Sequence, residues 1–144
     1  MPKTLEKIEA FLAKHHLLSL ATVAGNCPQS ASLFYAYDVE NVGFVVASDR
    51  KTEHIRNVLV NDKVSGTVAL ETDIVGKIEG IQFKGIMRAI SQEEGSLYFK
   101  KFPYARVMKP QLWQIELAEI KLTDNRLGFG KKLYWQRADS RELE

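Results

Sequence analysis

Apolar residues near the start of the chain recur at the period of an α-helix, with charged residues mostly on the opposite face. The recurring positions are Leu5, Ile8, Leu12 and His15. Thr4 suits a helix N-cap, because its hydroxyl can accept a hydrogen bond from a free backbone N–H group. This pattern predicts an amphipathic helix of about three turns whose apolar stripe packs against the rest of the molecule.

Most of the remaining chain consists of strand-like segments separated by short turns. Leu18–Val23 is an apolar run that ends at Gly25, and Ser30–Tyr37 alternates between two faces, which predicts an antiparallel hairpin. Further strands are predicted at residues 43–47, 64–70, 80–90 and 132–136, with two strand-like stretches that meet near Ala118 in 112–123, and short helices near 55–61 and 93–101. The predicted fold class is mainly β (α+β), an antiparallel barrel of six or seven strands with short flanking helices.

The composition fits one soluble globular domain spanning residues 1–144. With 45% hydrophobic and 26% charged residues, the chain can form a core, which excludes disorder for most of its length. Twenty basic residues against 18 acidic ones give a net charge of +2, which is too even to favour a nucleic-acid partner. The single cysteine, Cys27, excludes an intramolecular disulfide and a multi-cysteine zinc site, and a reducing cytoplasm is the expected location.

One uncharged stretch, residues 17–37, is long enough to span a bilayer. Gly25, Asn26, Pro28 and Gln29 lie in its middle, and these residues are typical of a turn between two strands. The amphipathic, charged segment that precedes the stretch does not resemble a signal peptide. We therefore expect two strands here and no membrane partner.

Cationic and hydroxyl side chains gather in one pentapeptide, Ser48-Asp49-Arg50-Lys51-Thr52, where a predicted strand meets a predicted helix. We call residues 48–52 the elbow. The start of a helix presents free N–H groups to an anion, and Lys, Arg and hydroxyl side chains add charge and donors, so the pattern fits a phosphate site. The same residues fit a solvated turn in which Asp49 or Thr52 caps the helix. The segment lacks the glycines of a P-loop, and both interpretations stay open.

Two polar residues lie within otherwise apolar predicted strands. The hydroxyl of Ser32 and the amide of Gln82 can form hydrogen bonds with the heteroatoms of a flat ring, or can face solvent on a half-exposed strand. Both interpretations of these two side chains stay open. Cys27 precedes Pro28 in a predicted turn without an evident partner base, so a catalytic thiol is not expected.

The three histidines do not have a spacing typical of metal ligands, and no metal is expected. His15 and His16 are adjacent at a predicted helix end, where a protonated histidine interacts favourably with the helix dipole. His54 follows the elbow by two residues and fits either a ligand contact or a surface position. Residues 123–132, in which two glycines flank Phe129, fit either a hairpin turn or a lid that meets a ligand or a second subunit.

Taken together, these segments resemble the pyridoxamine 5′-phosphate oxidase-like, FMN-binding split-barrel superfamily, and within it a YhbP-like bacterial branch. The resemblance covers most of the chain in matching order and spacing, and residues 120–131 are its most specific part. The matching blocks are the leading helix, Phe34-Tyr35 with Asp38, Lys51-Thr52, Gly66-Thr67-Val68, Gly80-Ile81-Gln82-Phe83-Lys84-Gly85, Phe102-Pro103-Tyr104-Ala105-Arg106, Ile120-Lys121-Leu122-Thr123-Asp124-Asn125 and Leu127-Gly128-Phe129-Gly130-Lys131.

The resemblance implies a six-stranded antiparallel split β-barrel that forms a homodimer, with two FMN molecules in grooves at the dimer interface. It assigns the FMN phosphate to four residues of the elbow: Ser48, Arg50, Lys51 and Thr52. It also implies that one strand segment lines the flavin: Ser32, Leu33 and Phe34. Gln82 is expected near the ring, two residues nearer the glycine of its strand than in the oxidases. Lys131 is expected to close the site from the tail or from the partner subunit.

Two features of the oxidases are missing. Ser32 stands where the oxidases have an arginine, and the chain has no C-terminal Arg-x-His motif, so oxidation of pyridoxamine phosphate is not expected. The first hypothesis is an FMN-dependent oxidoreductase in which the flavin performs the redox chemistry, with no residue identified as a general acid or base. One alternative is a non-catalytic module that binds flavin, deazaflavin or haem, with His54 or His15 as candidate haem ligands. Another is a structural dimer with a degenerate site.

Overall fold

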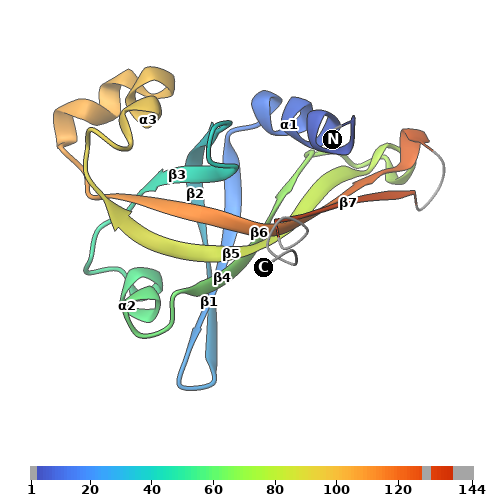
Figure 1. Ribbon diagram of the computed structural model, residues 1–144. Helices are drawn as coiled ribbons and strands as arrows, with labels where there is room; N and C mark the ends of the chain where they lie inside the picture. Colours follow the sequence, from blue (N-terminus) through green and yellow to red (C-terminus); the bar gives the residue numbers. More distant parts are fainter. Residues whose placement is uncertain (1–2, 128–130, 138–144) are drawn as a thin grey trace.

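The computed structural model describes residues 3–127 and 131–137 of the chain. Its strands are β1 (Leu17–Ala24), β2 (Cys27–Asp38), β3 (Gly43–Ala47), β4 (Lys63–Ala69), β5 (Glu79–Ile90), β6 (Leu112–Asp124) and β7 (Lys132–Gln136). They form one antiparallel sheet in the order β3-β2-β1-β4-β5-β6-β7, and a further pairing between β3 and β6 closes six of them into a barrel (Figure 1). The predicted six-stranded antiparallel barrel is confirmed, with β7 added beside β6.

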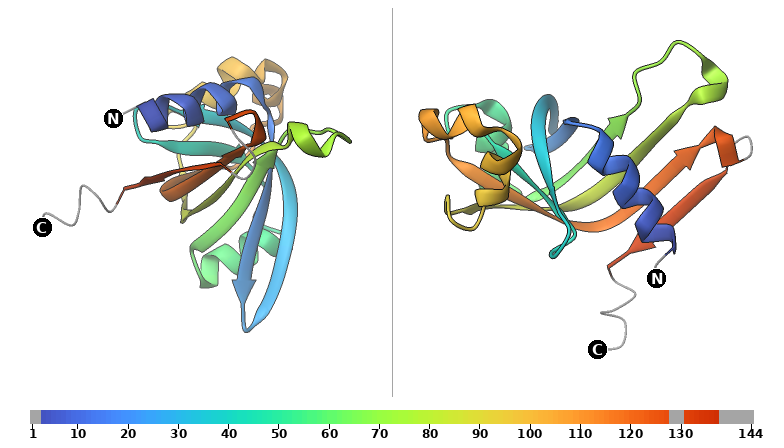
Figure 2. Two further views of the ribbon diagram at one scale, coloured as in Figure 1. Left: turned by 90° about the vertical axis from the view of Figure 1, so that its right-hand side faces the viewer. Right: turned by 90° about the horizontal axis from the view of Figure 1, so that it is seen from above.

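Short helices flank the barrel. They are α1 (Lys3–Lys14), α2 (Glu53–Val60) and α3 (Ser96–Lys101), with the 3-10 segments η1 (Val75–Lys77), η2 (Pro103–Met108) and η3 (Asn125–Leu127). In Figure 1, α1 and α3 lie above the barrel and α2 lies below it. Figure 2 shows that α1 runs across the barrel toward β7, which it contacts. None of the helices among the described residues is long and apolar enough to cross a bilayer.

The core forms where the apolar stripe of α1 meets the inward-facing residues of the barrel strands. Phe44 lies at its centre, with its ring 4.8 Å from that of Tyr35 and 5.1 Å from that of Phe83, measured between centroids. The Tyr35 hydroxyl donates a hydrogen bond to the carbonyl of Leu12 at 2.7 Å, which fixes α1 on the barrel. Burial raises the pKa of Tyr35, so this hydroxyl stays a neutral donor. From α1 the buried residues are Ile8, Phe11 and Leu12.

The uncharged stretch of residues 17–37 forms the β1–β2 hairpin, as predicted. Gly25 and Asn26 form its turn, with φ angles of 56° and 62°, and this left-handed conformation suits a tight two-residue hairpin turn. Apolar and polar positions alternate along β2, so that Tyr35 faces the core while Ser32 and Phe34 face outward. The hairpin therefore exposes a mostly uncharged outer face.

Residues 112–124 form one strand where the sequence pattern predicts two. Lys84 pairs with Glu119 and Gly85 pairs with Leu117, which leaves Ala118 as a β-bulge without an opposite residue on β5. Before the bulge β6 pairs with β3 and closes the barrel, and after it β6 pairs with β7. The bulge therefore marks the point at which the barrel ends and the added strand begins.

The helix predicted at residues 93–101 begins later than expected, at Ser96. The backbone amide of Ser91 donates to the Glu94 carboxylate and the Glu94 amide donates to the Ser91 hydroxyl, each at 3.0 Å. These reciprocal bonds hold residues 91–94 in a turn, in the manner of a capping box. The turn uses the polar residues that the sequence pattern assigned to the first turn of the helix.

Candidate functional site

The elbow forms a tight turn between the end of β3 and the start of α2. Thr52 is the N-cap of α2, and its hydroxyl accepts a hydrogen bond from the Ile55 amide at 3.4 Å. The Asp49 carboxylate accepts from the Lys51 amide at 2.7 Å, and the Asp49 carbonyl accepts from the Thr52 amide at 3.1 Å. Thr52 is thus the helix cap, as one interpretation of the sequence proposed, and its neighbours stay exposed on the turn.

The two cationic side chains of the elbow, Arg50 and Lys51, differ in their contacts. The Arg50 guanidinium lies 5.2 Å from the centroid of the Trp113 ring, which positions it by a cation–π contact. Trp113 in turn donates from Nε1 to the carbonyl of Ser48 at 3.0 Å. Among the described residues, none forms a hydrogen bond or an ion pair with the Lys51 ammonium. The elbow therefore carries an exposed positive charge that no carboxylate of residues 3–127 and 131–137 pairs with.

His54 lies behind the elbow, because its side chain is only 8% exposed and faces the hydroxyls of the turn. Its Nε2 atom is 2.6 Å from Ser48 Oγ and 3.3 Å from Thr52 Oγ1. Burial lowers the pKa of His54, so the ring is neutral at neutral pH. A surface position for His54 is thereby ruled out, and the side chain supports the elbow from within.

The segment Ser32–Phe34 of β2 precedes the part of this strand that pairs with β3. Tyr35 and Val46 are the last pair of the β2–β3 ladder, and both this segment and the elbow continue from that end of it. The Leu33 side chain packs on the core and that of Ser32 is exposed. Phe34 is 55% exposed, and its ring lies 5.5 Å from that of Phe102. The elbow and this strand segment thus adjoin the same pair of strands, β2 and β3.

Gln82 lies elsewhere, in a groove of about 490 Å³ on the outer face of the sheet. The side chains of Gln82 and Thr67 are exposed there, on the paired strands β5 and β4. The remaining lining residues come from β1, β2, β4, β5, β6 and β7: Ser19, Leu20, Ala21, Ser30, Ser65, Gly66, Phe83, Lys84, Glu119, Lys121 and Tyr134. No elbow residue lines this groove, so a single chain does not bring Gln82 and the elbow into one pocket.

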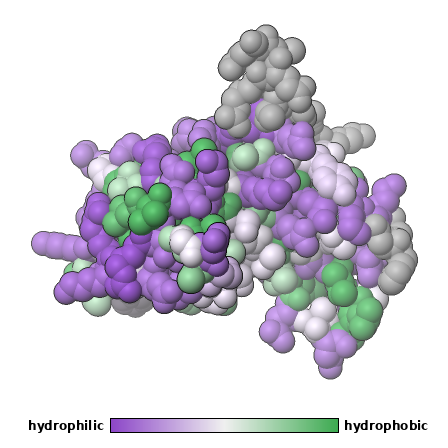
Figure 3. Space-filling model, turned by 90° about the horizontal axis from the view of Figure 1, so that it is seen from below, coloured by the Kyte–Doolittle hydropathy of each residue, from purple (hydrophilic) through white to green (hydrophobic). Residues whose placement is uncertain are grey.

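Most of the surface seen from below is hydrophilic, and hydrophobic side chains gather there in separate small patches (Figure 3). Exposed apolar residues occur at the end of α2, where they are Leu59 and Val60, and around η1, where they are Ile74, Val75 and Ile78. These residues are too scattered to form one binding surface, and exposed apolar residues of this kind are common on soluble domains.

Lys131 lies in the connection between β6 and β7, where its carbonyl accepts a hydrogen bond from the Asp124 amide at 3.4 Å. This connection and α2 lie at opposite ends of the barrel (Figures 1 and 2). Lys131 is exposed, but it does not approach the elbow of its own chain. The neighbouring residues 128–130, which include Phe129 of the proposed lid, lie outside the described residues.

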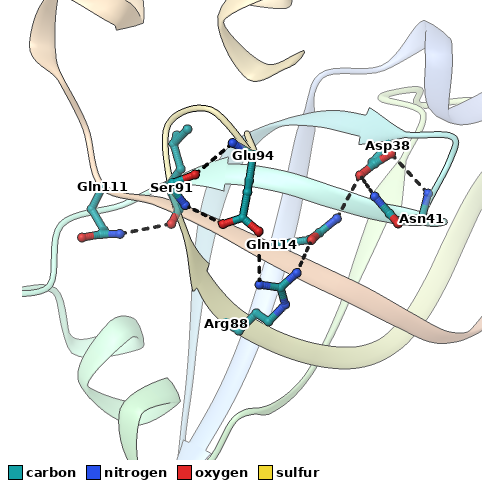
Figure 4. A network of polar contacts seen from close by, with 8 residues as sticks. Asp38, Asn41, Arg88, Ser91, Glu94, Gln111 and Gln114 are labelled. Atoms are coloured by element: carbon teal, nitrogen blue, oxygen red, sulfur yellow. Dashed lines mark hydrogen bonds and ion pairs between the residues drawn. The ribbon is translucent and has the colours of Figure 1, made fainter. Parts of the chain in front are cut away.

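A second polar cluster has a structural explanation. The Asp38 carboxylate accepts from Gln114 at 2.9 Å and from Asn41 at 2.7 Å, and the Gln114 carbonyl oxygen accepts from Arg88 at 3.1 Å (Figure 4). Arg88 also forms an ion pair with Glu94 at 3.9 Å, and Glu94 lies in the turn before α3 (Figure 4). Each buried partner is satisfied within this chain of contacts, so the cluster ties β2, β5 and β6 together.

Sequence reasoning did not identify several groups of the site. It did not find the pairing of His54 with Ser48, because the contact depends on the angle at which α2 leaves the elbow. It also did not select Thr67 and Lys84 of the groove, although both stand at outward positions of alternating strands. Among the described residues, no three His, Cys, Asp or Glu side chains gather in a way that can hold a metal ion.

The closed barrel, the added strand and the grooved outer face define a protein of the split-barrel class. No family model matches the chain. The chain is 42% identical over 139 residues to a UPF0306 protein of Cronobacter sakazakii, which covers 94% of this chain and 96% of that protein. The chain belongs to the UPF0306 family.

Solved structures of low sequence identity share the fold. The haem-binding protein from Mycobacterium smegmatis superposes with a TM-score of 0.76 at 14% identity, covering 94% of this chain and 59% of that one. The FAD-binding protein from Mesorhizobium loti superposes with a TM-score of 0.68 at 13% identity, covering 81% of this chain and 89% of that one. At these identities the likeness establishes the split-barrel fold and leaves the ligand to be argued from the residues.

Proposed function

We propose that this protein binds FMN as a homodimer and is a small oxidoreductase of the pyridoxamine 5′-phosphate oxidase-like superfamily, in its YhbP-like branch. The observation that carries the proposal is the elbow. Its unpaired Lys51 ammonium and the Ser48 hydroxyl stand at the start of α2. The elbow and the β2 segment that the resemblance assigns to the flavin both continue from the same end of the β2–β3 ladder. A phosphate at this position gains from opposite charge, from the Ser48 hydroxyl and from the free N–H groups of the helix.

The residues of the elbow fit the phosphate group of FMN. Lys51 supplies a charge-assisted hydrogen bond, and Arg50 can turn an N–H edge to the anion while its face stays on Trp113. The Asp49 carboxylate accepts from the Lys51 amide, and the two cations Arg50 and Lys51 outnumber it, so the elbow keeps a net positive charge. Ser48 adds a hydroxyl on the same turn, whereas the hydrogen of the Thr52 hydroxyl is donated to the Asp49 carbonyl.

The flavin ring is assigned to the outer face of the sheet, along Ser32, Leu33 and Phe34. When bound, FMN supplies hydride or electron transfer, and the protein supplies position and electrostatics. The groove that Gln82 lines contains neither Lys131 nor any residue of the elbow. If these two residues contact the cofactor, they do so across a two-fold interface, with each FMN held between the elbow of one subunit and the groove of the other.

The decisive experiment is a titration of the purified protein with FMN, followed by the quenching of flavin fluorescence. We expect saturable quenching with a stoichiometry of one FMN per chain. A screen of nicotinamide donors against the loaded protein then tests for turnover, which appears as bleaching of the flavin absorbance. A protein that leaves flavin fluorescence unchanged at every concentration contradicts the proposed cofactor.

A haem-binding module of the same fold is the second candidate. The observation that favours it is a depression of about 510 Å³ lined by His15, His16 and Phe34, which offers imidazole beside an aromatic ring. His54 does not suit this role, because its Nε2 already faces two hydroxyls. Visible absorption separates the candidates, since bound haem gives a Soret band and bound flavin gives its own two bands. A deazaflavin is distinguished by its shifted absorbance, and binding of none of the three supports the structural dimer.

A further inference from the structure

The hydrogen bonds of Thr52 determine which ring nitrogen of His54 carries a hydrogen. The Thr52 hydroxyl has one hydrogen, which it donates to the Asp49 carbonyl at 2.7 Å. Its oxygen already accepts from the Ile55 amide at 3.4 Å. Toward His54 Nε2, 3.3 Å away, the Thr52 oxygen therefore has no hydrogen to give and can only accept.

This arrangement fixes the tautomer of His54. A neutral imidazole carries one N–H, and the contact with Thr52 is favourable only if that hydrogen is on Nε2. In the other tautomer, a lone pair on Nε2 faces a lone pair of the Thr52 oxygen. Because burial lowers the pKa of His54, the neutral ring is the form present at neutral pH.

The same N–H reaches Ser48. Ser48 Oγ is 2.6 Å from Nε2, so the serine oxygen accepts and its own hydroxyl hydrogen is left to donate. Among the described residues, no other group forms a hydrogen bond with this hydroxyl. The backbone of Ser48 is fixed on both sides, because its amide donates to Gln111 and its carbonyl accepts from Trp113, each at 3.0 Å.

We propose that His54 is a positioning residue which, in its Nε2–H tautomer, turns the Ser48 hydroxyl outward as a hydrogen-bond donor to the FMN phosphate. The inference rests on the proposed function, since it assigns a role within that same phosphate site. It makes Ser48 a preset donor whose orientation is determined before the ligand arrives. Such preorganisation strengthens binding because the hydroxyl loses little rotational freedom when the anion binds.

The first test needs no ligand. Nitrogen NMR of the isotope-labelled full chain at neutral pH identifies which ring nitrogen of His54 carries the hydrogen. We expect the hydrogen on Nε2. A hydrogen on Nδ1 overturns the proposal, because Nε2 is then an acceptor that consumes the Ser48 hydrogen. The variant His54→Gln assigns the resonance.

The second test compares FMN with riboflavin, which lacks the phosphate. His54→Leu removes the N–H that orients Ser48 and should weaken FMN binding by about two- to tenfold, the range expected when a polar side chain must be ordered on binding, while riboflavin binding stays unchanged. His54→Gln retains an N–H at a similar reach and should restore most of the FMN affinity. Equal losses for both ligands indicate a merely structural role and overturn the proposal, as does unchanged FMN affinity in His54→Leu.

A double-mutant cycle completes the test. Ser48→Ala should cost about tenfold in FMN affinity when His54 is present and much less in the His54→Leu background, because the serine is no longer preset there. Independent effects of the two substitutions overturn the coupling. If the parent protein binds no FMN at all, the proposed function fails, and with it the phosphate role of Ser48. The NMR result still decides whether His54 presets that hydroxyl, which keeps the two failures distinguishable.

Discussion

At the scale of single residues, the site is defined by which polar groups have partners and which do not. Arg50, Ser48 and Thr52 are each held by a neighbour, through Trp113, His54 and Asp49 respectively. Lys51 differs, because no described residue pairs with its ammonium. Because the Lys51 ammonium has no partner among the described residues, its removal should affect ligand binding strongly and the stability of the fold little.

The first prediction concerns this ammonium. Lys51→Ala removes a charge-assisted contact worth about 1.5–3 kcal/mol, so FMN affinity should fall by about tenfold or more. The melting temperature should stay within about a degree or two of the parent, since an exposed lysine adds little to stability. Fluorescence titration with FMN and with riboflavin checks the result, and Lys100→Ala on α3 is the matched control. FMN binding by Lys51→Ala as tight as in the parent contradicts the phosphate assignment.

The second prediction concerns pH. Burial lowers the folded-state pKa of His54 below its ordinary value of 6.5. The unfolded chain therefore binds the proton more readily than the folded one, and the free energy of unfolding should decrease as the pH falls from about 6.5 through the folded-state pKa. His15 shares this dependence, because burial lowers its pKa as well.

Replacing His54 should make the dependence shallower. We expect His54→Gln to show a smaller loss of unfolding free energy between neutral and mildly acidic pH than the parent, measured by urea denaturation at several pH values. Gln136→Ala, at an exposed position without a titratable group, serves as the control and should keep the parent slope. An identical slope in the parent and in His54→Gln contradicts a buried neutral His54.

The sequence showed that cationic and hydroxyl side chains gather in the elbow, but it did not show which group each of them contacts. Five consecutive polar residues between a strand and a helix fit either an anion site or a solvated turn that caps the helix. The position of His54 depends on the turn geometry, which folds a residue two places beyond the elbow back beneath it. The order of residue types along the chain does not specify this turn geometry.

At the scale of elements, the bulge in β6 allows one strand to pair with β3 before it and with β7 after it. Gly85 faces it on β5, and a Cβ atom there would lie 2.4 Å from the carbonyl oxygen of Glu116. The close approach of β5 and β6 at this point requires glycine. The sequence pattern located the irregularity near Ala118 but split the strand in two, since a bulge reverses the alternation of faces and only the pairing with β5 shows that the strand continues.

The third prediction follows from this contact. Gly85→Ala should destabilise the fold by about 1–3 kcal/mol, because the added methyl group overpacks against the backbone of β6. Gly76→Ala in η1 is the matched control, since a Cβ there meets no atom within 4 Å, and its effect should be within about 0.5 kcal/mol. Chemical denaturation of the two variants beside the parent provides the measurement. Equal stability of Gly85→Ala and Gly76→Ala would show that β5 and β6 accommodate the added methyl group without a loss of unfolding free energy.

At the scale of the whole molecule, the outer face of the sheet is lined mostly by small side chains around the groove that contains Gln82. Small side chains follow one another across β1, β2 and β4: Ser19, Ala21, Ser32, Ser65 and Thr67. A sheet face of this kind can pack closely against a second copy of itself, and two-fold pairing is the commonest form of such an assembly. The fold class was predictable from hairpin spacing, whereas the proposal that two chains share each site comes from the separation of Gln82 from the elbow.

The fourth prediction tests that pairing. Thr67→Glu places a carboxylate in the middle of the face, where dimerisation would bury two unpaired charges, so the variant should be monomeric and should lose FMN binding. Sedimentation of parent and variant at matched concentrations measures the association. Ser96→Glu, at the exposed start of α3, is the control and should leave the mass unchanged. A dimeric Thr67→Glu that binds FMN normally would exclude this face from the interface.

The contact between Trp113 and the elbow has a practical consequence. Of the two tryptophans, Trp113 is buried with its indole N–H on Ser48 and Arg50 above its ring, while Trp135 lies on β7 beneath Arg137. The emission of Trp113 should therefore respond to any anion that draws Arg50 away from it. A Trp135→Phe chain would then carry a single built-in optical reporter of elbow occupancy, able to register colourless ligands such as inorganic phosphate as readily as coloured ones.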